Sequence, residues 1–144
     1  MTALRLEGYA ALFGVADLQG DVVHAGAFQA TLARNAVLPM LVRHDPRLPA
    51  GVWTHLREDA RGLRVEGVVE PSARAGALAA RLVARGVDGL SIGFRAVTQR
   101  PRHGGGRDLL TIDLIEISIV PTPMVPHARL SRAAFSGSER MLHA

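Results

Sequence analysis

Three side chains of the kind used in serine hydrolysis stand at separate places along the sequence. Ser91 begins one extended segment, His44 ends another, and Glu116 lies in the middle of a third. Hydrolysis by serine needs a hydroxyl near a base, and the base is held by a third group that sets its tautomer. The ingredients are therefore present, provided that the three segments are neighbours in the fold.

The extended segment after Gly89 alternates in character. A period of two puts Ser91, Gly93 and Arg95 on one face, opposite an apolar face. The serine hydroxyl is thus predicted to point away from the apolar stripe. Gly93, which has no side chain, is expected to leave room for a substrate backbone.

Glu116 shares its predicted face with aliphatic neighbours. Ile112, Leu114 and Ser118 have the same parity in the segment from about Leu109 to Val120. A carboxylate among aliphatic side chains is seldom buried without a cationic or hydrogen-bonding partner. A histidine is one candidate, and one of the 17 arginines is another.

Each residue also has an ordinary structural interpretation. A serine in a strand is most often structural, and a histidine before Asp-Pro is typical of a turn. Asp45 competes with Glu116 as the third group, although adjacent residues in an extended chain usually point apart. His55 is a second candidate base, whereas His24, His103, His127 and His143 fall in predicted loops or in the tail.

Composition narrows the classes of protein. The chain has 144 residues, of which 48% are hydrophobic, and this fits one domain with its own core. The absence of cysteine excludes disulfides, thiolate zinc sites and a cysteine nucleophile. No apolar run reaches the roughly 18 to 20 residues that span a bilayer, so we expect no membrane association and no secretion.

The basic character comes from arginine alone. The chain has no lysine and a net charge of +4, and its arginines are spread without a basic run. One tryptophan, one tyrosine and four phenylalanines offer little surface for stacking bases. The composition therefore argues against nucleic-acid binding.

The elements that must position these residues are mostly strands. We predict an α+β, mainly β fold: a small antiparallel β-barrel or strongly bent sheet flanked by two or more helices. A domain over residues 1–128 is expected to precede a loosely ordered tail, 129–144. The predicted strands are Leu4–Phe13, Val37–Arg43, Gly51–Leu56, Leu63–Val69, Leu90–Val97 and Leu109–Val120, and the predicted helices are Ala27–Asn35 and the segment from an N-cap at Ser72 to Arg85 before Gly86.

Five blocks of sequence, in this order, resemble the prohead protease family of tailed phages. They are Gly8–Phe13, Gly20–Val23 leading into Gly26–Phe28, Leu41–Asp45, Gly89–Phe94 and Leu114–Pro121. That family is similar in fold to herpesvirus assemblin. The resemblance implies His44 as general base and Ser91 as nucleophile, and by analogy Glu116 as the third catalytic member.

The resemblance also implies a function. It is that of a serine endopeptidase without cofactor or metal, which cleaves capsid scaffolding segments, and its own ends, as a phage or a phage-like gene-transfer particle matures. Its substrate partner is then the major capsid protein or a scaffold segment, inside the immature capsid in the cytoplasm of the bacterial host. A homodimer through the helix Ser72–Arg85 is allowed, but a plain core helix is favoured. Oxyanion donors are implied around Pro123–Val125, where no adjacent arginine pair is present.

Three other interpretations stay open at this point. One is a catalytically silent capsid-assembly or scaffold-binding module. Another is a basic nucleic-acid-binding β-barrel, suggested by the arginines of residues 100–107. The third is a metal hydrolase that uses Asp21, His24, His44 and Asp45, although no His-Glu-x-x-His spacing supports it.

Overall fold

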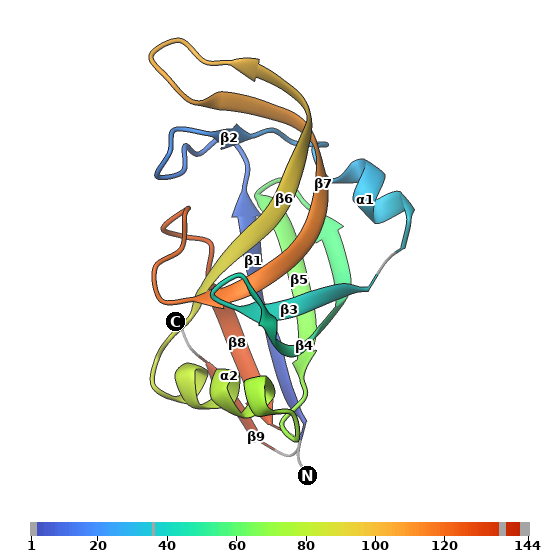
Figure 1. Cartoon of the computed structure of the whole chain (residues 1–144), viewed down its shortest axis with the longest axis vertical. Helices are drawn as coiled ribbons and strands as arrows, with labels where there is room; N and C mark the ends of the chain where they lie inside the picture. The colour runs from blue at the N-terminus through green and yellow to red at the C-terminus, as the bar shows by residue number, and fades with distance from the viewer. Residues whose placement is uncertain (1–2, 36, 136–137, 142–144) are drawn as a thin grey trace.

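A nine-stranded sheet curls round one apolar core in the computed structural model, which describes residues 3–35, 37–135 and 138–141 (Figure 1). The order in the sheet is β2-β7-β3-β4-β5-β1-β8-β9, and β6 pairs with β7 along its whole length. The strands are β1 (Leu4–Leu12), β2 (Val22–Val23), β3 (Leu38–Val42), β4 (Asp45–Glu58), β5 (Gly62–Val69), β6 (Gly89–Pro101), β7 (Arg107–Val120), β8 (Leu130–Phe135) and β9 (Ser138–Met141).

The sheet is mixed rather than wholly antiparallel. The hairpins β4–β5 and β6–β7 are antiparallel, as alternation and turn residues predict, but β2 and β3 run parallel to β7. In the β3–β7 register Leu41 lies opposite Ser118. The C-terminal ends of β3 and β7 therefore lie at the same edge of the sheet, and the turn that follows β3 reaches side chains of β7.

The sheet curls far enough for its distant strands to meet. The N–H of Leu90, at the start of β6, donates to the carbonyl of Ala128 at 2.8 Å. The N–H of Leu130 donates to the carbonyl of Asp88 at 2.7 Å. From this region the long β6–β7 hairpin extends to the opposite end of the molecule (Figure 1). This agrees with the predicted strongly bent sheet.

The core lies inside the curl. Trp53 is fully buried, and its Nε1–H donates to the carbonyl of Ile117 at 3.0 Å, which satisfies the indole nitrogen. This bond ties β4 to β7 across β3. The other large, fully buried side chains come from most of the sheet and from the segment before α1: Phe28, Leu4, Leu6, Met40, Leu63, Leu90, Leu109, Ile112, Ile117, Ile119 and Leu130.

Two helices cover the sheet in the described ranges: α1 (Gln29–Ala33) beside β7, and α2 (Arg74–Ala84) against β4. The buried face of α2 consists of Ala75, Gly76, Ala79 and Val83, while the predicted stripe residues Leu78 and Leu82 are only partly buried. The small residues let the helix lie close to the sheet. This packing is that of a core helix.

The ends of α2 test two local predictions. The prediction that Ser72 is the N-cap of α2 was wrong, because Ala73 occupies that position and makes no side-chain bond. The Ser72 hydroxyl donates instead to Glu70 Oε1 at 2.5 Å. A nearby carboxylate thus competes for the hydroxyl. Gly86 has φ of 95°, the left-handed conformation predicted for the residue that follows a helix.

The expected tail from residue 129 onward is wrong for its first part. β8 pairs with β1 from Leu4 to Gly8, and Leu130 and Ala133 are buried in that contact. Several residues of β8 have small side chains, and the segment has little hydrophobic alternation, so its sequence alone does not indicate a strand. It forms one because it pairs with β1, which is distant in the sequence. Residues 136–137 and 142–144 of the predicted tail lie outside the described residues. Among the described helices none is long and apolar enough to span a membrane.

Candidate active site

His44 stands in a tight turn directly after β3. Arg43 and His44 both have left-handed backbone conformations, with φ of 54° and 61°. Such angles are uncommon for residues with side chains and need support from their surroundings. Here Arg43 N–H donates to the carbonyl of Ile119 at 3.0 Å, and His44 N–H donates to the Ser118 hydroxyl at 2.9 Å. β7 therefore holds the turn.

The imidazole of His44 contacts the carboxylate of Glu116. The distance from His44 Nδ1 to Glu116 Oε2 is 2.5 Å, and the other carboxylate oxygen, Oε1, accepts the Ser118 hydroxyl at 2.7 Å. Glu116 is 7% exposed, so both oxygens of a buried carboxylate are satisfied. Histidine is thus its partner, and no arginine within the described residues takes that place.

This contact changes the acid–base behaviour of His44. The hydrogen bond to Glu116 raises the pKa of His44 above its ordinary value, and the carboxylate charge adds to this effect, while partial burial opposes it. A carboxylate accepts the hydrogen bond, so Nδ1 carries the proton. In the neutral ring Nε2 is then the basic nitrogen, which is the tautomer required of a general base.

Gly93 lies opposite Glu116 in the β6–β7 ladder. A Cβ at Gly93 would stand 2.1 Å from Glu116 Oε2, far closer than two such atoms approach. The space that the sequence suggested for a substrate backbone is occupied by the glutamate carboxylate. Gly93 thus allows Glu116 to reach His44.

Ser91 pairs with Ser118 two residues along the same ladder, and residues directly opposite in a ladder project to the same face. It is 4% exposed and lines, together with His44, a cavity of about 230 Å³. No hydrogen bond of its hydroxyl is found within the described residues, and no buried polar atom there lacks a partner, so the hydroxyl opens to the cavity.

The cavity is mainly apolar. Its walls come from β1, β2, β6, β7 and the loop before β8, and they include Leu12, Val23, Leu90, Ile92, Phe94, Leu109, Met124 and Val125. The polar part contains Asp21, whose pKa is lowered by its hydrogen bonds with Arg107; Arg107 Nη2 lies 2.7 Å from Asp21 Oδ2. This pair joins the loop before β2 to the start of β7.

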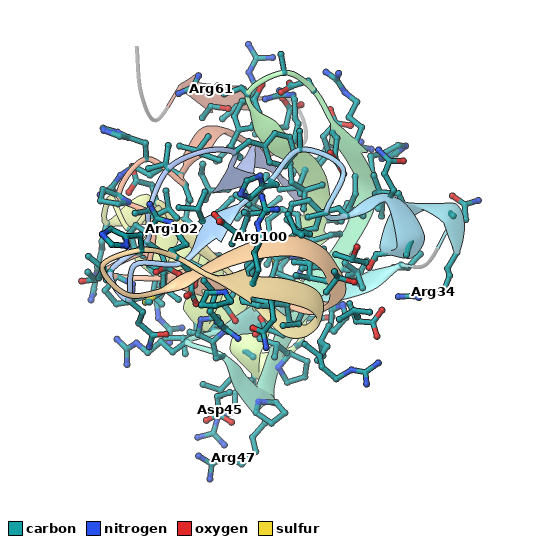
Figure 2. The ribbon with its side chains drawn as sticks, turned by 90° about the horizontal axis from the view of Figure 1, so that it is seen from above. Arg34, Asp45, Arg47, Arg61, Arg100 and Arg102 are labelled. Carbon is teal, nitrogen blue, oxygen red and sulfur yellow. The ribbon has the colours of Figure 1, made fainter. Side chains whose placement is uncertain are left out.

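Asp45, the competing third group, turns away from His44. It binds Arg47, whose Nη2 lies 3.0 Å from Asp45 Oδ2, and this hydrogen bonding lowers the pKa of Asp45. Figure 2 shows the two side chains together at the outer end of the turn, away from the body of the molecule. The alternative base, His55, is exposed on β4 beside Glu66.

The residues of the metal-site hypothesis do not meet. Asp21 pairs with Arg107, His24 with Asp108, and Asp45 with Arg47, whereas His44 pairs with Glu116. Across the described ranges no group of three or more histidine or acidic residues is arranged to hold a metal ion.

The arginines that suggested nucleic-acid binding are largely engaged within the molecule. Arg100 and Arg102 each lie 3.6 Å from Asp108, and both are labelled in Figure 2. Arg107 binds Asp21 and Gln99. These pairs partly neutralise the positive charge of the hairpin.

One residue of the site has no predicted role. From its parity in the strand, Ser118 was predicted to lie on the same face as Glu116, without a function. Its hydroxyl donates to Glu116 within β7, and it accepts the backbone N–H of His44, a bond that depends on the β3–β7 pairing. The available signal was its parity with Glu116 in one strand.

Comparison with solved structures shows the fold. The protease of Kaposi's sarcoma-associated herpesvirus, in complex with a hexapeptide phosphonate inhibitor, matches with a TM-score of 0.57 and 16% identity over 92% of this chain and 64% of that one. Varicella-zoster virus protease matches with a TM-score of 0.51 and 17% identity over 78% of this chain and 57% of that one. The predicted assemblin-like fold is confirmed.

Comparison of sequences shows the family. The chain is 38% identical over 91 residues to the prohead protease of Enterobacteria phage HK97, an alignment that covers 61% of this chain and 40% of that protein. It therefore spans about 40% of the length of this relative. The family model described as caudovirus prohead serine protease matches residues 1–142. With a match over nearly its whole length, and the resemblance seen in the five sequence blocks, the chain belongs to the caudovirus prohead serine protease family.

Proposed function

We propose that the chain is a serine endopeptidase of capsid maturation in which Ser91 is the nucleophile, His44 the general base and Glu116 the group that orients His44. The observation that carries this proposal is the contact between His44 Nδ1 and the buried Glu116 carboxylate. It leaves His44 Nε2 as the basic nitrogen in the cavity that Ser91 also lines. Two observations support peptide hydrolysis. The family is described as one of serine proteases, and a serine, a histidine and a carboxylate are the residue types of a catalytic triad.

The reaction proceeds through an acyl-enzyme. Ser91 Oγ attacks the carbonyl carbon of the scissile peptide while His44 Nε2 takes the hydroxyl proton. His44 then gives this proton to the leaving amine nitrogen as the C–N bond breaks. A water molecule then gives a proton to His44 Nε2 and attacks the carbonyl carbon of the ester on Ser91. As the ester bond breaks, His44 returns this proton to Ser91 Oγ. Glu116 orients His44 and stabilises the imidazolium in both steps.

The oxyanion of each tetrahedral intermediate needs N–H donors. The loop around Pro123–Val125 is our proposal for their source, because Met124 and Val125 line the cavity with Ser91. Pro123 has no N–H, which leaves the backbone donors of Met124 and Val125 as the candidates. The apolar walls further favour a substrate with an apolar side chain near the scissile bond.

The family match is the basis of our proposal for the substrates and the cellular setting. We infer that the protein cleaves the major capsid protein or a scaffolding segment, and its own ends, inside the immature capsid in the bacterial cytoplasm. A homodimer is also proposed, because a solved structure of the Kaposi's sarcoma-associated herpesvirus protease, a protein of the same fold, is in complex with a dimer disruptor. Sedimentation of the purified chain over a range of concentrations tests the dimer, and a single monomeric species throughout contradicts it.

Coexpression with the capsid protein of the same particle tests the proposal. Wild-type protein is expected to shorten the capsid protein at a defined site, seen by mass spectrometry, and Ser91→Ala is expected to leave it intact. Ser72→Ala is the matched control, because Ser72 is an exposed serine bound only to Glu70. Unchanged cleavage by Ser91→Ala refutes the assignment of the nucleophile.

A fluorophosphonate probe separates this proposal from a catalytically silent assembly module. The probe reacts with a serine only where a base activates it. We expect labelling of Ser91 in wild-type protein and its loss in His44→Ala. Equal labelling of the two proteins contradicts the role of His44.

A further inference from the structure

Ser118 makes two hydrogen bonds, one with the backbone of His44 and one with the carboxylate of Glu116, which contacts the His44 ring. Its hydroxyl oxygen accepts the backbone N–H of His44 at 2.9 Å, and the same hydroxyl donates to Glu116 Oε1 at 2.7 Å. Ser118 is 0% exposed, so it cannot meet substrate. One buried side chain thus contacts both the orienting carboxylate and the main chain of the base.

The direction of each bond follows from the groups present. A carboxylate only accepts and a backbone N–H only donates, so the single hydroxyl proton must point to Glu116 and a lone pair must face His44. The donor and the acceptor of each bond are therefore fixed by the chemistry of the three groups. The hydroxyl thus donates to the carboxylate oxygen that does not face His44.

The bond to His44 acts on a backbone that needs support. The turn holds Arg43 and His44 at φ of 54° and 61°, left-handed angles that residues with a side chain rarely adopt. The second bond of this turn, from Arg43 N–H to the carbonyl of Ile119, is also to β7. Because the ring direction follows the backbone, a loosened turn carries Nδ1 away from Glu116.

We propose that Ser118 is a positioning residue, which fixes the His44 turn and the Glu116 carboxylate relative to each other so that the imidazole stays aligned for catalysis. This inference rests on the proposed function of His44 and Glu116. It adds a fourth side chain that touches neither the substrate nor the reacting atoms.

Other charges near His44 do not substitute for this arrangement. Glu116 is the charged group in contact with the ring. On the turn itself, Arg43 is exposed and Asp45 is bound to Arg47. The ionisable groups that share the cavity with His44 are Asp17, Asp21 and Arg107.

Ser118→Ala tests the proposal with two readouts. We expect kcat to fall about 10- to 100-fold with little change in KM, because the base is misplaced while the substrate cavity is intact. In an NMR titration of the protein without substrate, the pKa of His44 is expected to move down towards its ordinary value as the bond to Glu116 is populated less. Ser118→Thr retains the hydroxyl and is expected to recover most of both properties.

Thr31→Val is the matched control for stability. The buried Thr31 hydroxyl accepts the backbone N–H of Leu114 at 3.1 Å, the same kind of bond, but outside the cavity. This variant is expected to be destabilised to a similar degree with an unchanged His44 pKa and kcat. Equal falls in kcat for Ser118→Ala and Thr31→Val, or an unmoved His44 pKa in Ser118→Ala, overturn the positioning role.

The two proposals fail in different ways. If Ser91→Ala still cleaves the capsid protein, the proposed function is wrong, whatever Ser118 does. If Ser91→Ala is inactive but Ser118→Ala keeps the wild-type kcat and His44 titration, only the positioning role is wrong. The NMR titration needs no turnover and so stays informative in either case.

Discussion

His44 Nδ1 and Glu116 Oε2 lie 2.5 Å apart although 72 positions separate the two residues in the chain. The contact exists because β3 runs parallel to β7, which places the turn after β3 above the last residues of β7. Glu116 is buried and His44 is partly open to the cavity. A charged group is thus shielded from water while the ring that it orients stays accessible.

Glu116→Gln tests the role of the carboxylate. The amide is nearly the same size but carries no charge, and it can present N–H₂ instead of oxygen to His44, which favours the wrong tautomer. We expect kcat/KM to fall by about 10²- to 10⁴-fold with the fold retained. Steady-state kinetics with a fluorogenic capsid-derived peptide measures this change.

Asp45→Asn is the control for that variant. Asp45 binds Arg47 at the exposed end of the turn and does not contact the imidazole. Its kcat/KM is expected to stay within about twofold of wild type, as for a surface substitution. If kcat/KM falls more in Asp45→Asn than in Glu116→Gln, Asp45 and not Glu116 is the group that orients His44.

The raised pKa of His44 predicts the pH dependence of activity. The base must be neutral, so kcat/KM is expected to rise with pH through the pKa of His44, at a pH above that of an ordinary histidine. In Glu116→Gln the same limb moves to lower pH because the hydrogen bond and the charge that raise the pKa are gone. Rate profiles over pH 5 to 9 distinguish these cases, and a limb at the same pH in both proteins contradicts the assignment.

The same shift has a consequence for folding. Because His44 has a higher pKa in the folded protein than in the unfolded chain, the pair adds stability that is fully present below the unfolded pKa. This contribution is lost as the pH rises through the folded pKa. Urea denaturation of wild type and Glu116→Gln at several pH values is expected to show a difference that shrinks as the pH rises.

Gly93→Ala is expected to disable the site while the fold is kept. The new Cβ meets the carboxylate of Glu116 rather than backbone, so the side chain of Glu116 is displaced from His44. We expect kcat to fall about 100-fold. In a Glu116→Ala background the same substitution is expected to cost little more, and fully additive losses in this double-mutant cycle contradict a shared mechanism.

Trp53→Phe tests the anchor beneath the site. The substitution removes the bond from Nε1 to the buried carbonyl of Ile117 and leaves a small void, and we expect a loss of about 2 kcal/mol in the free energy of unfolding. Trp53 is the one tryptophan of the chain, so the variant has no tryptophan fluorescence to follow. Unfolding in urea is therefore measured by circular dichroism. Val52→Ala, at a partly exposed neighbour, is expected to change stability by about 0.5 kcal/mol.

Much of the fold follows from local pattern. Alternation predicted β1 and β7 nearly to their ends, the Asp59–Gly62 turn predicted the β4–β5 hairpin, and Gly86 marked the end of α2. These features depend on neighbours in sequence, whose periodicity and turn preferences act directly. The failure at β8 has the opposite cause, because a distant strand decided its pairing. At Ser72 two local preferences competed, and the hydroxyl bonds Glu70 instead of capping the helix.

The sequence alone determined which residue types are present to do chemistry, and its ordered blocks pointed to the family that the comparisons then showed. Only the tertiary structure decided which of them meet. Glu116 rather than Asp45 contacts His44, Gly93 makes room for that carboxylate, and Ser118 joins the two. The physical reason is that strand periodicity specifies the face on which a side chain lies, whereas the parallel pairing of β3 with β7 and its register specify which faces come together.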